Sequence, residues 1–130
     1  MGKRKQRPPL SEGQLEIMNA VWEQDEATVS DVWKTLSRRR PVARNTVQTL
    51  MTRLEEKGWL KHRSEGNRFL YSAVPERSTA LGKMVSQLVE TAFGGSAEEL
   101  MLALLDSRGI SHKEAARIKT MIKKAEEEES

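Results

Sequence analysis

The chain has 130 residues, of which 37% are hydrophobic and 32% charged, which fits one soluble domain or a small domain with an oligomerisation segment. It contains no cysteine, which excludes disulfides, thiolate metal sites and cysteine nucleophiles. No stretch approaches the roughly 20 apolar residues of a membrane span, and the N-terminus lacks the apolar core of a signal peptide, so we expect a cytoplasmic protein.

Basic charge is concentrated in the first part of the sequence. Residues 1–75 carry 14 basic and 9 acidic side chains, whereas residues 76–130 carry 8 basic and 10 acidic side chains. A basic half favours a polyanionic partner, while a solvated charged surface explains the same numbers equally well.

Residues 1–10 are predicted to form a flexible basic arm, because their prolines prevent a helix and they bury nothing. The first helix begins at Ser11, which with Gln14 has the spacing of a capping box, and runs to about Gln24. Its predicted buried face repeats at helical spacing through Leu15, Met18, Val21 and Trp22.

Two further helices are predicted before the periodicity changes. Thr28 caps the second helix, which stops before Pro41 because the residue preceding a proline is pushed out of the helical conformation. The third helix spans about Arg44 to Lys57 and is ended by Gly58.

Residues 59–74 have the pattern of a β-hairpin. Residues 59–63 and 68–74 are aromatic or β-branched runs on either side of the turn-forming residues 64–67. Three helices followed by a hairpin, with a tight turn between the second and third helices, is the order of a winged helix-turn-helix domain. We place that domain at residues 11–75.

Residues 76–130 are predicted to form a three-helix dimerisation domain, with helices over about 77–92, 97–106 and 112–126. The middle helix is apolar all round from Leu100 to Leu105, which only burial explains. So little protein is present to bury it that a second subunit is favoured, with a compact monomeric subdomain as the alternative. The predicted dimer contacts are Leu81, Met84, Leu88, Leu100, Met101, Leu104, Leu105, Ile118 and Ile122.

The third helix carries the predicted DNA-reading face, because its apolar side chains cluster on the opposite side. Asn and Gln pair bidentately with adenine, and a Thr methyl packs on a thymine methyl, although any surface helix shows a polar outer face. Helix N-termini attract phosphates, and charged wings lie along the DNA backbone. These arguments predict DNA contacts by Arg44, Asn45, Gln48, Thr49, Thr52, Arg53, Arg63 and Arg68.

Catalytic, metal and cofactor sites are not expected. His62 and His112 are isolated and have no partner at ligand spacing. The sequence contains neither a Ser-His-Asp order nor a phosphate-binding glycine loop. We therefore expect neither an enzyme nor a small-molecule substrate.

Four segments of the sequence resemble the penicillinase repressors, the BlaI/MecI/CopY family of transcriptional regulators. They are residues 15–22 (LEIMNAVW), 45–58 (NTVQTLMTRLEEKG), 69–72 (FLYS) and 93–95 (FGG). The resemblance implies a homodimeric repressor whose winged helix binds an inverted repeat in a promoter and whose C-terminal helices entwine. Carried over by position, the DNA-reading residues are Asn45, Thr46, Gln48, Thr49 and Arg53. Family repressors often have Lys or Arg where this chain has Asn45 and Gln48.

The resemblance also bears on how repression is relieved. In well-known members a membrane sensor protease system triggers cleavage in the middle C-terminal helix, and the matching bond here joins Ala103 and Leu104, where those members have a polar residue before an aromatic one. The copper-responsive branch uses a C-terminal cysteine cluster, which the absence of cysteine excludes. Two alternatives stay open: a regulator gated by a small molecule bound between its domains, and a winged helix used only for protein interaction.

Overall fold

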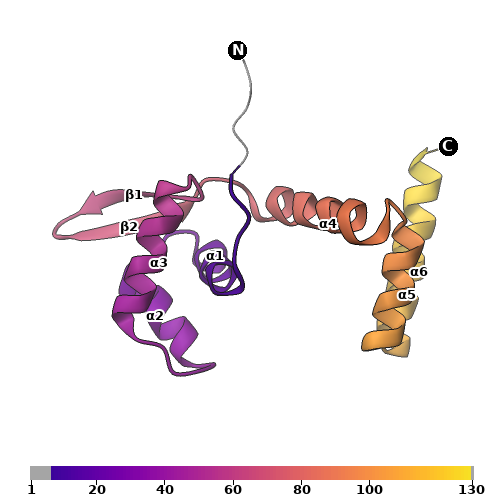
Figure 1. The fold of residues 1–130 in the computed structure, drawn as a ribbon, viewed down its shortest axis with the longest axis horizontal. Helices are drawn as coiled ribbons and strands as arrows, with labels where there is room; N and C mark the ends of the chain where they lie inside the picture. The colour runs from indigo at the N-terminus through magenta and orange to yellow at the C-terminus, as the bar shows by residue number, and fades with distance from the viewer. Residues whose placement is uncertain (1–6, 130) are drawn as a thin grey trace, which may run out of the picture. The chain divides into compact units, whose positions relative to one another are not determined.

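The first five elements of the computed structural model form a three-helix unit with a β-hairpin, and three more helices follow it (Figure 1). The structure describes residues 7–129. The elements in chain order are α1 (Glu12–Gln24), α2 (Val29–Ser37), α3 (Arg44–Glu56), β1 (Leu60–Glu65), β2 (Arg68–Ala73), α4 (Arg77–Phe93), α5 (Ala97–Ser107) and α6 (His112–Glu129). The mainly helical fold with a hairpin wing is confirmed.

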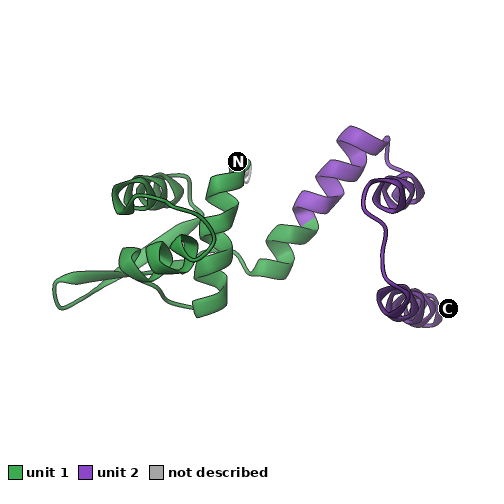
Figure 2. Cartoon of the chain, turned by 90° about the horizontal axis from the view of Figure 1, so that it is seen from below, with its two compact units in different colours: residues 1–82 green, residues 83–130 purple. Residues whose placement is uncertain are grey.

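The chain divides into two compact units, residues 1–82 and residues 83–130 (Figure 2). This division falls inside α4, whereas the sequence pattern placed a domain boundary between residues 75 and 76. The buried apolar side chains lie between Ile17 and Ala80, so the first unit has a core of its own.

The buried face of α1 is centred on Ile17, which with Met18 and Val21 has no exposed surface. The sequence pattern placed Leu15 and Trp22 in this face, but both are only half-buried. The Trp22 indole instead lies at the edge of the core, where its N–H donates to a backbone carbonyl 53 residues away at 3.0 Å. That bond satisfies the polar end of a large side chain, which is the usual arrangement for a tryptophan at a core boundary.

Two capping boxes begin α1 and α2 where the sequence predicts them. The Gln14 amide donates to Ser11 Oγ at 3.2 Å, and the Ser11 amide donates to Gln14 Oε1 at 3.0 Å. In the same way the Asp31 amide donates to Thr28 Oγ1 at 3.1 Å, and the Thr28 amide donates to Asp31 Oδ2 at 3.0 Å. The hydrogen bond from the Thr28 amide holds the pKa of the Asp31 carboxyl below its ordinary value.

Removing the second of these caps is expected to destabilise the winged helix. The Thr28→Ala substitution should lower the free energy of unfolding by about 1 kcal/mol, because the Asp31 amide loses its acceptor in the first turn of α2. Urea denaturation followed by circular dichroism measures this difference. Ser37→Ala, at the exposed C-terminal end of α2, is the matched control and should change the free energy by less than about 0.5 kcal/mol. Equal effects of the two substitutions would contradict the assignment of Thr28 as a cap.

The hairpin is held against the helices by one further pair of backbone hydrogen bonds. Strands β1 and β2 are antiparallel, with a register that runs from Leu60 opposite Ala73 to Glu65 opposite Arg68. Ala27, in the turn between α1 and α2, pairs with Tyr71 of β2 through bonds of 2.9 and 2.8 Å. This isolated bridge fixes the wing to the α1–α2 turn.

Part of the predicted N-terminal arm contacts the winged helix. The Arg7 guanidinium donates to the carbonyl of Gly58 at 2.8 Å and lies 5.6 Å from the centre of the Trp59 ring. The Trp59 indole in turn donates to the carbonyl of Pro8 at 3.0 Å. Residues 1–6 of the predicted arm lie outside the described residues.

The second unit leaves several of its large apolar side chains exposed to solvent. Neither α5 nor α6 buries a residue over their described range, 97–129. Leu102 and Leu105 of α5 are 53% and 48% exposed, and Met121 and Ile122 of α6 are 62% and 54% exposed. A single copy of the chain therefore offers these helices little cover. Over residues 7–129, none of the helices combines the length and the hydropathy needed to cross a membrane.

Candidate nucleic-acid interface

The outward face of α3 is exposed along its length and is backed by the core. Val47, Met51 and Leu54 on the inner side have no exposed surface, which fixes how the helix is rotated. The predicted contact residues on this helix are all exposed: Arg44, Asn45, Thr46, Gln48, Thr49, Thr52 and Arg53. The structure thus brings the α3 part of the predicted site together on one surface.

The side chains on this surface are short and mostly uncharged, which leaves room for a base pair edge. The Thr52 hydroxyl donates to the carbonyl of Gln48 at 3.0 Å, a bond within the helix. The Thr52 hydroxyl hydrogen is therefore not free to donate to a base. The Asn45 and Gln48 amides each offer a donor and an acceptor, the pattern that pairs with adenine in the major groove.

The N-terminus of α3 differs from those of α1, α2 and α5, which have side-chain caps. Its N-cap is Ala43, which offers no side-chain acceptor, and the first turn contains no acidic residue. The Arg44 guanidinium donates to Ser30 Oγ from two nitrogens at 3.3 Å, so it is tethered to α2 beside this end of the helix. Uncapped amides and a nearby guanidinium are chemically suited to hold a phosphate.

The basic turn between α2 and α3 contributes less free charge than the sequence suggests. Arg40 Nη2 lies 2.6 Å from Glu16 Oε1, and this hydrogen bond lowers the pKa of the Glu16 carboxyl below its ordinary value. The turn is also fixed by the Trp33 indole, which donates to the carbonyl of Val42 at 2.9 Å. Arg40 therefore ties α1 to the turn. Arg38 and the neighbouring Arg39 are exposed.

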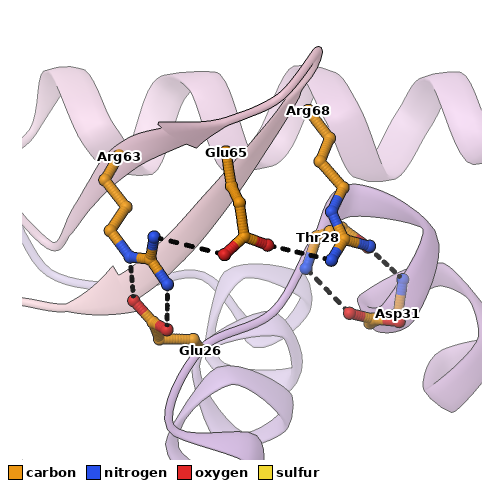
Figure 3. Close-up of polar contacts among 6 residues, drawn as sticks. All are labelled: Glu26, Thr28, Asp31, Arg63, Glu65 and Arg68. Atoms are coloured by element: carbon orange, nitrogen blue, oxygen red, sulfur yellow. Dashed lines mark hydrogen bonds and ion pairs between the residues drawn. The ribbon is translucent and has the colours of Figure 1, made fainter.

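Both wing arginines predicted to contact DNA are engaged by carboxylates of the same chain (Figure 3). Arg63 donates to the two oxygens of Glu26 from Nε and Nη2, each at 2.8 Å. Its third nitrogen, Nη1, lies 3.6 Å from Glu65, and Arg68 Nη2 lies 3.1 Å from the other oxygen of Glu65. The hydrogen bond to Glu26 raises the pKa of Arg63 and lowers that of Glu26. Sequence patterns missed Glu26, which is 37 residues from its partner.

The opposite face of the hairpin is joined to α3 by an aromatic cluster. His62 Nδ1 lies 2.7 Å from a carboxylate oxygen of Glu55, near the C-terminal end of α3. The His62 ring is stacked on Phe69 with centroids 4.1 Å apart, and it is tilted against Tyr71 at 5.4 Å. The wing is thus positioned relative to α3 by side chains on one face and to the α1–α2 turn by side chains on the other.

The chain is similar to known repressor proteins over most of its length. The chain is 27% identical to the penicillinase repressor of Bacillus licheniformis over 110 residues, which cover 85% of this chain and 86% of that protein. It is 23% identical to the methicillin resistance regulatory protein MecI of Mammaliicoccus sciuri, with 88% of this chain and 94% of that protein covered.

A solved structure matches the winged helix. In the Bacillus licheniformis BlaI monomeric form, solved in complex with the blaP half-operator, 33% of the aligned residues are identical and the TM-score is 0.50. The match covers 58% of this chain and 92% of that one. The family model described as penicillinase repressor matches residues 10–124. The chain belongs to the penicillinase repressor family.

Proposed function

We propose that this chain is a homodimeric transcriptional repressor that binds an inverted repeat in a promoter and occludes it. The observation that carries the proposal is the exposed polar face of α3. The opposite side of this helix packs into the core of the first unit, which fixes the direction in which the polar face points. The related BlaI protein, whose winged helix is 33% identical, was solved on a half-operator. Because a transcriptional repressor must reach the chromosomal DNA that it binds, we place this chain in the cytoplasm.

Base recognition belongs to α3 in this proposal. The amides of Asn45 and Gln48 read base edges, the methyl groups of Thr49 and Thr52 pack on thymine, and Arg53 reaches a phosphate or a guanine. Arg44 positions the helix on the DNA backbone at the start of α3, and Thr46 belongs to the DNA-reading residues carried over from the family. The role of the wing arginines is different, since both are ion-paired within the chain.

The dimer is formed by the C-terminal helices. The partly exposed apolar side chains of α4, α5 and α6 supply a surface that a second copy covers, which removes apolar area from water on both chains. The proposed contacts are Leu81, Met84, Leu88, Leu100, Met101, Leu104, Leu105, Ile118 and Ile122. Two-fold symmetry then presents one α3 to each half of the repeat, with half-sites one helical turn or a multiple apart.

Relief of repression is proposed to occur by disruption of this dimer. We propose that proteolysis of the bond between Ala103 and Leu104, under the control of a membrane sensor protease system, separates α6 from the part of α5 that precedes the bond. The bond lies within the helix, so α5 has to unwind locally before a protease accepts it as an extended strand. A chain truncated after Ala103 should sediment as a monomer and bind the operator at least about 100-fold more weakly, because the linkage between half-sites is lost. A truncated chain that stays dimeric would rule out this route.

Fluorescence anisotropy tests the repressor function directly. The purified chain is titrated onto the promoter region of its own operon and onto a random duplex of equal length, at 50 and 200 mM salt. We expect tighter binding to the promoter, weakened strongly by salt because phosphate contacts release counterions. Equal weak binding to both duplexes, without salt dependence, would contradict the proposal and favour a protein-interaction role for the winged helix.

A further inference from the structure

Two arginines on one face of the hairpin are paired with carboxylates of the same chain. In the register of the two strands, Arg63, Glu65 and Arg68 lie on the same face, and Glu26 reaches that face from the α1–α2 turn (Figure 3). Glu65 lies between the two guanidiniums, within 3.6 Å of Arg63 and 3.1 Å of Arg68. Two arginines are therefore matched by two carboxylates, and the four side chains together carry no net charge.

The position of Glu26 is fixed by the backbone on both sides. The preceding residue, Asp25, has a φ of 66° and a ψ of −58°, and the Glu26 amide donates to the carbonyl of Gln24 at 2.7 Å, which closes a γ-turn after α1. The following residue, Ala27, is paired with Tyr71 of β2 by two backbone hydrogen bonds. Because the next residue in the chain is bonded to the wing, the backbone at Glu26 is held close to Arg63.

The bond between Glu26 and Arg63 has the geometry that a phosphate would otherwise take. Both oxygens of the carboxylate accept from Arg63, at 2.8 Å each, which is the bidentate arrangement that guanidinium groups also form with phosphates. A DNA phosphate that displaces Glu26 leaves a carboxylate next to the phosphate. The gain from the new contact is then offset by repulsion between the two anions.

We propose that Glu26, assisted by Glu65, is a specificity-determining residue that suppresses sequence-independent binding of DNA by the wing. This inference rests on the proposed function. Attraction to phosphates supplies nearly all of non-specific binding, whereas base contacts distinguish the operator from other DNA. By neutralising Arg63 and Arg68, the carboxylates let the wing lie along the DNA backbone without adding affinity for DNA of random sequence. Discrimination is then left to α3.

The Glu26→Gln substitution tests this role, with Glu23→Gln as its matched control. Both remove one negative charge near the end of α1, but only Glu26 is the partner of Arg63, whereas Glu23 is exposed on the helix. For each wing in contact with the duplex, we expect Glu26→Gln to bind a random duplex about tenfold more tightly in 50 mM salt and about threefold more tightly in 200 mM salt, with a salt slope steeper by about 0.9. Glu23→Gln should stay within about twofold of the wild type on both duplexes.

Two further variants assign the effect to the ion pair. The gain in affinity for the random duplex should disappear in the double variant Glu26→Gln, Arg63→Gln, because the guanidinium released from its carboxylate is then absent. Glu65→Gln should raise random-duplex affinity in the same direction, since it leaves Arg68 without the carboxylate that the structure places 3.1 Å away. In both single variants the ratio of operator affinity to random-duplex affinity should fall.

The outcomes separate this inference from the function on which it rests. If the wild type prefers its operator but Glu26→Gln behaves like Glu23→Gln, the inference is wrong and the repressor function stands. The inference is also overturned if Glu26→Gln weakens binding to both duplexes, because Glu26 then serves only to position the wing. A wild-type chain without operator preference refutes the repressor function itself.

Discussion

Alanine at both Asn45 and Gln48 should lower operator affinity by about 100-fold or more, because each bidentate amide contact to a base contributes about 1–3 kcal/mol of discrimination. Both side chains are exposed on the outer face of α3, opposite the buried Val47 and Met51. Affinity for a random duplex should change little, since phosphate contacts remain. Anisotropy titrations on the two duplexes measure the two effects separately.

Asn19→Ala provides the control for this variant. Asn19 is an exposed asparagine of α1, in the same unit but outside the proposed interface, and its replacement should leave both affinities unchanged. If the double variant kept its operator preference, the assignment of α3 as the recognition helix would be wrong. If it lost affinity equally for both duplexes, the two amides would be contacting the backbone and not the bases.

Placing charges on the apolar surface of α5 and α6 should dissociate the dimer. In the double variant Leu105→Asp, Ile122→Asp, two side chains that are 48% and 54% exposed in the single chain become carboxylates. A dimer that covers them would bury unpaired charges, so we expect a monomer in sedimentation equilibrium. Operator affinity should fall by about 100-fold or more, because the two half-sites are no longer linked.

The matched control places two aspartates on α6 at positions already polar. Lys119→Asp with Lys123→Asp should leave the chain dimeric, because both lysines are exposed and neither belongs to the apolar surface. The winged helix should unfold at the same urea concentration in all three proteins, since its core lies in residues 17–80. A Leu105→Asp, Ile122→Asp variant that remained dimeric would show that α5 and α6 are not the interface.

The elements of the fold could be predicted from the sequence because their signals are local. Ser11 and Thr28 begin helices through residues three positions later, and Gly58 follows the end of α3 with a φ of 85°. The hairpin follows from the change of period and from the turn at Gly66, whose φ is 64°. Each of these features is determined by side chains a few residues apart.

The rotation of α1 was predicted less well. Sequence periodicity favoured a face that contained Leu15 and Trp22, whereas the structure buries Ile17 fully and leaves those two half-buried. A helix with apolar residues at many positions is compatible with several rotations, and only the neighbouring elements select one. In the same way the pattern did not show that Arg7 contacts Gly58, which is 51 residues away.

The electrostatics of the candidate site depended on contacts that are distant in sequence. The basic neighbours of Arg63 in the sequence predict a DNA contact, whereas its ion pair with Glu26 is visible only in the structure. Arg40 is likewise paired with a residue distant in sequence, Glu16, 24 residues away. A side chain's charge can be taken from the sequence, whereas its partner can be taken only from the fold. The outer face of α3 was predictable because one helix contains all of it.

Hydroxyl-radical footprinting of the chain's own promoter is the most direct test of a repressor that binds as a symmetric dimer through α3. We expect two protected segments related by a two-fold axis, with centres one helical turn or a multiple of it apart, and loss of both in the Asn45→Ala, Gln48→Ala variant. A single protected segment without a symmetric partner, or protection that persists in that variant, would contradict the account.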